Sequence, residues 1–315
     1  MKRIAWVMGL LLVVGLTACS KKDVTAPPRP STWQTVTVDP AAGVGWHTSL
    51  ALDAQGNPRI SYFDYDNGHL LYTAKSGATW TAETVDATGS VGTYASLALD
   101  GQGNPRISYF DATNGHLKYA AKNGGAWTLE TADATAGVGF YTSLALDGQG
   151  NPRISYFDYT NDRLKYAARD GGTWTVETVD ATGSVGSYTS LALDGQGNPH
   201  ISYYDYTNGD LDYASKSGGT WTKETVDDVY FTGQYTSLAL DGQGNPCIGY
   251  YDYSAGTLDL RYATKRGGTW TKVKVDTLGD VGKYASLKLD GQGNPRISYL
   301  DFTNRHLKYA DWGVH

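Results

Sequence analysis

A repeat of about 47 residues runs through this chain and constrains its fold more than any other feature. The stretch SLALDGQGNPRISYFDATNGHLKYA, from Ser96 to Ala120, returns as near copies that begin at Ser49, Ser143, Ser190, Ser237 and Ser286. A second element, WTAETVD, recurs in variant form at Trp33, Trp80, Trp127, Trp174, Trp221 and Trp270. Tandem repeats of this period are typical of solenoids, propellers or arrays, in which each repeat is one supersecondary unit.

Each period contains four segments with the length and residue types of β-strands. In one unit these are the Trp80 element, then residues 94–99, 107–110 and 117–122, and Gly, Asn, Asp and Pro turns separate them. Four strands in about 47 residues leave no room for a crossover helix, so neighbouring strands must pair antiparallel. Six such sheets predict an all-β, six-bladed β-propeller of four-stranded antiparallel blades.

The ends of the chain indicate how the ring closes. An open solenoid would need polar capping repeats, yet the first and last units are as apolar as the others. One Trp element stands unpaired at the start, while the last unit lacks one. We therefore expect Trp33–Asp39 to supply the outermost strand of the last blade, beside residues 285–289, 297–300 and 307–310, in a single domain from 32 to 315.

The repeat resembles a known propeller family. LALDGQGNPRISYFDATNGHLKY is similar to the repeats of NHL-type six-bladed propellers, in which an inner strand ends in Asp before a Gly-Asn turn, and a second strand ends in another Asp. The chain departs from that pattern by two extra residues, such as Pro105 and Arg106. The resemblance implies that the SLALD strand is innermost, and it implies the fold rather than a function.

The N-terminus carries a targeting segment. Lys2 and Arg3 precede an apolar run, and the run ends in Leu16-Thr17-Ala18-Cys19. LTAC resembles the lipobox of bacterial lipoproteins, which implies a signal peptide at 1–18 and an acylated Cys19 that binds membrane lipid, with Ser20 favouring the outer membrane. An ordinary secretory signal is the alternative. Residues 19–31, rich in proline, are expected to form a flexible tether.

Charge and cysteine content narrow the classes of partner. The net charge is −6 and no stripe of Lys or Arg forms, so nucleic-acid binding is disfavoured and we expect none. Cys247 occupies a slot that holds Arg or His in the other units, and we interpret it as an incidental free thiol. We expect a monomer held together by its own core.

Twelve aspartates are predicted to gather at one face, called the top face, where each outer strand leads into the next inner strand and the second strand turns into the third. They are Asp39, Asp64, Asp86, Asp111, Asp133, Asp158, Asp180, Asp205, Asp227, Asp252, Asp276 and Asp301. Calcium takes six to eight oxygen ligands, so a calcium site is one interpretation of this face. Because each Asp recurs in every unit, we interpret them as turn caps and expect no metal and no cofactor.

The residues that break the repeat on the top face are mostly aromatic. They point to a non-catalytic module that binds a protein or a glycan, and the candidate contacts are Trp46, Phe140, Tyr230, Phe231, Gln234 and Tyr253. Two alternatives stay open. One is a propeller hydrolase or lyase that uses His47, which replaces a tyrosine of the other units, with a top-face Asp. The other is a structural spacer of the cell envelope.

Overall fold

The computed structural model describes residues 36–254 and 256–312. The predictions for the signal peptide, Cys19 and the tether lie outside these residues, as do Trp33 to Thr35 of the expected closing strand. Val38–His315 form one compact unit, and the described residues fold into strands and turns without a helix.

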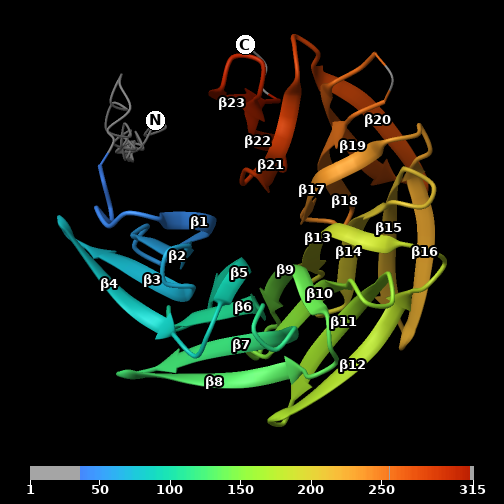
Figure 1. Ribbon diagram of the computed structural model, residues 1–315. Helices are drawn as coiled ribbons and strands as arrows, with labels where there is room; N and C mark the ends of the chain where they lie inside the picture. Colours follow the sequence, from blue (N-terminus) through green and yellow to red (C-terminus); the bar gives the residue numbers. More distant parts are fainter. Residues whose placement is uncertain (1–35, 255, 313–315) are drawn as a thin grey trace, which may run out of the picture. The chain divides into compact units, whose positions relative to one another are not determined.

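The described residues form twenty-three strands in six sheets. Figure 1 shows how these sheets are arranged. The first two blades are β1 (Val44–Leu52), β2 (Pro58–Asp64), β3 (His69–Ser76), β4 (Thr79–Asp86), and β5 (Val91–Leu99), β6 (Pro105–Asp111), β7 (His116–Asn123), β8 (Ala126–Asp133). The third and fourth are β9 (Val138–Leu146), β10 (Pro152–Asp158), β11 (Arg163–Asp170), β12 (Thr173–Asp180), and β13 (Val185–Leu193), β14 (Pro199–Asp205), β15 (Asp210–Ser217), β16 (Thr220–Asp227). The fifth and sixth are β17 (Thr232–Leu240), β18 (Pro246–Asp252), β19 (Asp259–Arg266), β20 (Thr269–Asp276), and β21 (Val281–Leu289), β22 (Pro295–Asp301), β23 (His306–Asp311).

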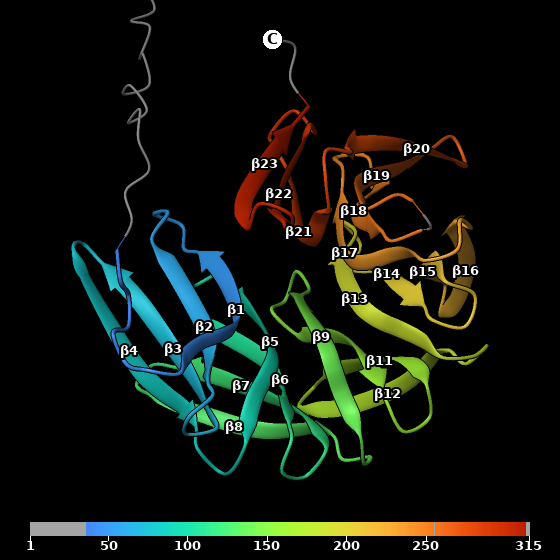
Figure 2. The ribbon, with the colours of Figure 1, turned by 45° about the horizontal axis from the view of Figure 1, so that its top comes forward.

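Strands pair antiparallel in chain order within every sheet, as the short connections require. The first strand of each blade packs against the first strand of the next, from β1 through β5, β9, β13 and β17 to β21. Figure 2 shows these inner strands facing a common centre. The chain is therefore a six-bladed β-propeller, and the prediction that the SLALD strand lies innermost is confirmed.

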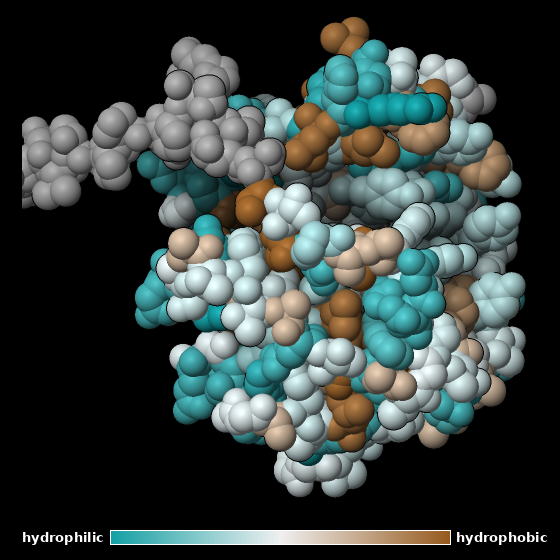
Figure 3. Space-filling view, turned by 60° about the vertical axis from the view of Figure 1, so that its left-hand side comes forward, coloured by the Kyte–Doolittle hydropathy of each residue, from teal (hydrophilic) through white to brown (hydrophobic). Residues whose placement is uncertain are grey.

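The core consists of separate clusters between consecutive blades. Between the second and third blades, Leu117, Tyr119, Ile154 and Tyr156 are buried together. Equivalent clusters lie between the other successive pairs, from the first blade to the sixth. The outer-strand tryptophans of the second to fifth blades cover such junctions, each 5.4 Å from a tyrosine ring of the preceding blade, as Trp174 is from Tyr119. On the side brought forward in Figure 3, hydrophobic residues form small groups among hydrophilic ones.

A carboxylate latch joins neighbouring blades near the top face. Asp133, at the end of β8, accepts hydrogen bonds from Tyr156 Oη and Lys165 Nζ of the third blade, both at 2.7 Å. Burial opposes ionisation of Asp133, yet these bonds hold its pKa down at about 2. The same three-residue arrangement recurs at Asp86 with Tyr109 and Lys118, and at Asp276 with Tyr299 and Lys308.

The last blade differs from the prediction. Its sheet has three strands, β21 to β23, and Val36 to Asp39 form no strand, so the expected four strands are not found there within the described residues. No strand of the described chain pairs with the outer edge of β23, and Leu307 and Tyr309 are 79% and 59% exposed. Asp39 Oδ2 does accept a bond from Tyr62 Oη at 2.7 Å, as Asp86 does from Tyr109 at 2.6 Å. Closure of the ring by Trp33–Asp39 stays a prediction.

Candidate functional site

An irregularity in each inner strand directs one side chain toward the centre. In the second blade the register between β5 and β6 shifts twice, between Val91 and Ser96. Gly92 has a φ of +112°, and a Cβ there would lie 2.7 Å from Leu70 Cβ, so only glycine fits. Tyr94 follows with a φ of +56°, a left-handed conformation that is costly for a tyrosine. The same conformation recurs at His47, Tyr141, Tyr188, Tyr235 and Tyr284.

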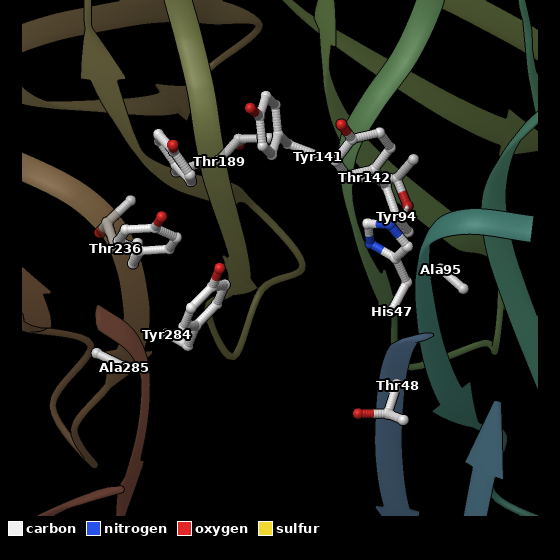
Figure 4. A pocket seen from close by; sticks show the side chains of 12 residues that line it. His47, Thr48, Tyr94, Ala95, Tyr141, Thr142, Thr189, Thr236, Tyr284 and Ala285 are labelled. Atoms are coloured by element: carbon white, nitrogen blue, oxygen red, sulfur yellow. Dashed lines mark hydrogen bonds between the residues drawn. The ribbon is translucent and has the colours of Figure 1, made fainter. Parts of the chain in front are cut away.

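These six residues form a belt of aromatic rings, called the central belt. Consecutive ring centroids from His47 to Tyr284 are 4.5 to 4.8 Å apart. Threonines and alanines on the next position of each strand complete a pocket of about 270 Å³. Figure 4 shows His47, Tyr94 and Tyr141 on one side of the open centre and Tyr284 on the other. The volume lies just below that of typical drug-sized sites, about 300 Å³ and more.

The central belt is uncharged. The residues that line its pocket are one histidine, five tyrosines, four threonines and two alanines, with no carboxylate, lysine or arginine among them. Burial raises the pKa of Tyr235 to about 12 and also raises that of Tyr94. These two phenols are therefore neutral and can both donate and accept hydrogen bonds.

A second set of aromatic residues surrounds the central belt. One residue directly follows the last Asp of each second strand, and in five of the six blades it is an exposed ring: Tyr65, Tyr159, Tyr206, Tyr253 and Phe302, each 51% to 68% exposed. Ala112 holds the position in the second blade. Of this set, only Tyr253 was predicted from the sequence. The other four were missed because departures from the repeat point to single residues, whereas these rings recur. Their position at the start of a top-face turn was the available signal.

Two of the predicted contacts differ in accessibility. Trp46 is 58% exposed, and its ring lies 5.8 Å from that of Tyr65, so the two form one aromatic surface. Phe140 is half-buried, with its ring 4.2 Å from Phe110 and 5.3 Å from Tyr159. Phe140 therefore supports its neighbours more than it offers a free surface.

The predicted residues of the fifth unit lie together. Tyr230, Phe231 and Tyr253 are in ring contact, with centroids 4.0 and 6.0 Å apart, and Gln234 pairs with Tyr251 across β17 and β18. Phe231 and Tyr253 line a pocket of about 390 Å³ with Ser254, Gly256 and Leu258, called the blade-five pocket. Tyr230 is 56% exposed, and its ring lies over Gly209 of the preceding blade.

The top-face aspartates are engaged in the fold. Asp111 accepts bonds from the backbone N–H groups of Thr113 and Asn114 and from the Asn114 side chain, and five equivalents cap their turns similarly. Of the other six, five end the outer strands and Asp39 precedes β1, and each accepts a bond from a buried tyrosine. Across residues 36–254 and 256–312, no group of His, Cys, Asp or Glu is arranged to hold a metal ion.

The two remaining residues singled out from the sequence lie in the central belt and in the core. His47 takes the sixth position of the belt, 4.8 Å from the Tyr94 ring, and no carboxylate lines the pocket with it. Cys247 is fully buried and free. No helix in the described part of the chain is long and apolar enough to cross a membrane.

Comparison with known proteins identifies the fold and not a family. No family model and no curated protein matches this chain. Among solved structures, a Dyadobacter fermentans protein of unknown function is similar at a TM-score of 0.58 and 13% identity over 86% of this chain and 98% of that one. An alpha-L-arabinanase of Penicillium chrysogenum complexed with arabinobiose matches at 0.57 and 11%, over 86% and 93%. A Hadza microbial sialidase matches at 0.56 and 13%, over 86% of this chain and 66% of its own length. At these identities the likeness shows a shared propeller fold.

Proposed function

We propose that this protein is a non-catalytic glycan-binding module whose binding surface is the top face. The observation that carries the proposal is the uncharged central belt, surrounded by exposed aromatic rings on the same face. A sugar ring has an apolar face of C–H groups and a rim of hydroxyl groups. Tyrosine offers both complements, an apolar ring and a polar hydroxyl, at little cost in side-chain entropy.

The lining of the central pocket supports binding over hydrolysis. Glycoside hydrolysis normally requires two carboxyl groups beside the bond that breaks, and no carboxylate lines this pocket. Asp86, one of the outer-strand aspartates, is ionised and bound to Lys118, Tyr109 and Thr88, and its counterparts in other blades are similarly occupied. A structurally similar arabinanase has been solved with arabinobiose, which makes that neutral disaccharide a suitable probe.

We further propose that acylated Cys19 anchors the module to the bacterial envelope, in the outer membrane. Its support is the Leu16-Thr17-Ala18-Cys19 sequence behind a basic and apolar start. Metabolic labelling with a fatty acid tests it: the wild type should incorporate the label and fractionate with membranes, whereas Cys19→Ala should do neither. Equal labelling of both proteins would contradict the proposal.

Binding is tested with the purified full chain and a set of linear arabinan, xylan and β-glucan disaccharides, including arabinobiose, by calorimetry. Tyr188→Phe keeps the ring and removes the hydroxyl, and we expect it to weaken binding about three- to tenfold. Tyr309→Phe, on β23 outside the top loops, is the matched control and should leave affinity unchanged. Equal affinity of wild type and Tyr188→Phe would place binding elsewhere.

A further inference from the structure

A row of aromatic rings connects the central belt to the blade-five pocket. Tyr235 of the belt lies 6.2 Å from Tyr251, and Tyr251 lies 6.2 Å from Tyr253, measured between ring centroids. Phe231 follows at 6.0 Å from Tyr253, and Tyr230 at 4.0 Å from Phe231. The rings from Tyr235 to Tyr253 therefore follow one another within the fifth blade, where Tyr251 is fully buried and donates its hydroxyl to Asp280 Oδ1 at 2.8 Å. Tyr230 extends the row over Gly209 of the preceding blade.

No other blade combines a row of this kind with a pocket at its end among the pockets described above. The third blade has Tyr141, Phe157 and Tyr159 in contact, but Gly137 stands where the fifth blade has Phe231. The second blade has Ala112 in place of the outer ring. In the fifth blade a turn longer by two residues, with Gly256 at a φ of +88°, shapes the outer side of the pocket.

The groups along this row are uncharged. The blade-five pocket is lined by Phe231, Tyr253, Ser254, Gly256 and Leu258, and Gln234 lies beside the row as an amide. Two ion pairs lie close to the row: Lys283 Nζ is 2.7 Å from Asp280 Oδ2, and Arg261 is 2.6 Å from Asp252. Asp228, two residues before Tyr230, is exposed and lies 3.6 Å from Lys272. Among the described residues that line the two pockets, an anionic ligand would find no cation and a cationic ligand no carboxylate.

We infer that the top face binds a linear, uncharged oligosaccharide that occupies two subsites, one unit in the central belt and a later unit in the blade-five pocket. This inference rests on the proposed function and adds the class of glycan and the path of its chain, from the centre along the fifth blade. The belt pocket holds about 270 Å³ and the blade-five pocket about 390 Å³, so neither takes a long chain alone. Joining two weak subsites through one ligand raises affinity by effective concentration.

The test compares chain lengths on the full-length protein. Arabinan, xylan and β-glucan oligosaccharides of two and six units are titrated, with a six-unit galacturonate as the charged probe. We expect one neutral series in which six units bind at least about tenfold more tightly than two. The galacturonate should bind at least about tenfold more weakly than that hexasaccharide.

Two variants locate the second subsite. Phe231→Gly removes the ring at a position with φ of +73°, where the first and third blades have glycine, so the backbone is not strained. Tyr253→Ala removes the exposed partner ring. Each variant should abolish the increase in affinity from two to six units, while its affinity for the disaccharide stays within about twofold of the wild type. Tyr309→Phe, on β23 outside the top loops, should keep the gain.

The outcomes separate the two proposals. If disaccharides bind through the belt and six units bind no more tightly, or if the gain survives both variants, the two-subsite inference is wrong and the binding function stands. If galacturonate binds as tightly as the neutral chains, the assignment of an uncharged ligand is wrong. If no oligosaccharide of the set binds, both proposals are overturned.

Discussion

The two faces of this propeller are built from the same repeat but differ in which of its groups are paired within the fold and which are exposed. At the bottom face, the turn between the first and second strands closes on itself through an aspartate, an asparagine and usually an arginine. At the top face, the aspartates also close their turns, but the residues around them present rings and hydroxyl groups to solvent. Where every polar group has a partner inside the turn, the residues stabilise the fold, and where rings stay exposed, the residues are available to a ligand.

The bottom turn of the third blade shows how complete this internal pairing is. Asp147 accepts bonds from Gln149 N and Asn151 N at 2.9 Å, from Asn151 Nδ2 at 3.0 Å and from Arg153 Nη2 at 2.8 Å. In the same blade the top face leaves Tyr159 66% exposed. The contrast therefore holds within a single repeat.

Replacing the bottom-face carboxylate is expected to have the largest effect on stability. Asp147→Ala leaves two backbone N–H groups and an amide without their acceptor, and we expect a loss of about 2–4 kcal/mol in the free energy of unfolding. Chemical denaturation measures it. Tyr159→Ala in the top face of the same blade should cost less than about 1 kcal/mol. Similar losses for both would show that the two faces do not differ as described.

Most of the fold could be predicted from the sequence, because turn-forming residues recur at the same positions in every repeat. The Asp-Gly-Gln-Gly-Asn-Pro and Thr-Asn-Gly segments fix the strand boundaries, and four strands per period fix the pairing. The start of each inner strand was missed: β5 begins at Val91 rather than at Tyr94, because a bulge with positive φ at Tyr94 follows Gly92 and does not end the strand.

The candidate site was only partly predictable, since departures from a repeat indicate individual residues and not the rings that recur. Trp46 and Tyr230 were found because they break the repeat, and Tyr253 because its turn is two residues longer; all three are exposed. Tyr188 and Tyr235 recur in five units, so their sequence positions indicate packing as readily as binding. Their shared direction toward the centre follows from a backbone conformation that sequence patterns do not report.

One latch between blades breaks the repeat and should make stability depend on pH. Asp180 accepts a bond from Tyr203, as in other junctions, but Asp212 stands where the third blade has Lys165. Lys223 supplies the cation to Asp180 at 2.6 Å instead. Asp212 Oδ1 is buried without a hydrogen-bond partner among the described residues. Burial, with the nearby carboxylates of Asp205 and Asp180, raises the pKa of Asp212 from 3.8 to about 7.

The sign of the effect follows from proton binding. Between about pH 4 and pH 7 the folded protein holds a proton on Asp212 that the unfolded chain releases, so this residue's contribution to stability falls as the pH rises through that window. Asp212→Lys restores the residue of the third blade and should be more stable than wild type by about 1–3 kcal/mol at pH 8, and by less at pH 5. Denaturation at both values measures the difference. A gain that is the same at pH 5 and pH 8 would show that Asp212 does not titrate in this range.

The bottom face has its own break at Cys247, where a smaller effect is expected. Arg106 and Arg153 each pair with the turn aspartate and lie opposite an alanine, Ala121 or Ala168. Cys247 instead lies opposite Thr264, its sulfur 3.5 Å from Thr264 Oγ1, and is fully buried.

Thr264, opposite Cys247, is larger than the alanine of the second and third blades, so we expect substitutions at 247 and 264 to have coupled effects on stability. Cys247→Arg alone overfills the space beside Thr264 and should lower the free energy of unfolding by about 1 kcal/mol. Adding Thr264→Ala recreates the arrangement of the second blade and lets the new arginine reach Asp241, so the double variant should recover that loss. A double-mutant cycle by denaturation measures the coupling, expected at about 1 kcal/mol. Additive effects of the two substitutions would mean that the pairing at the bottom face is not set by the residue across the strand.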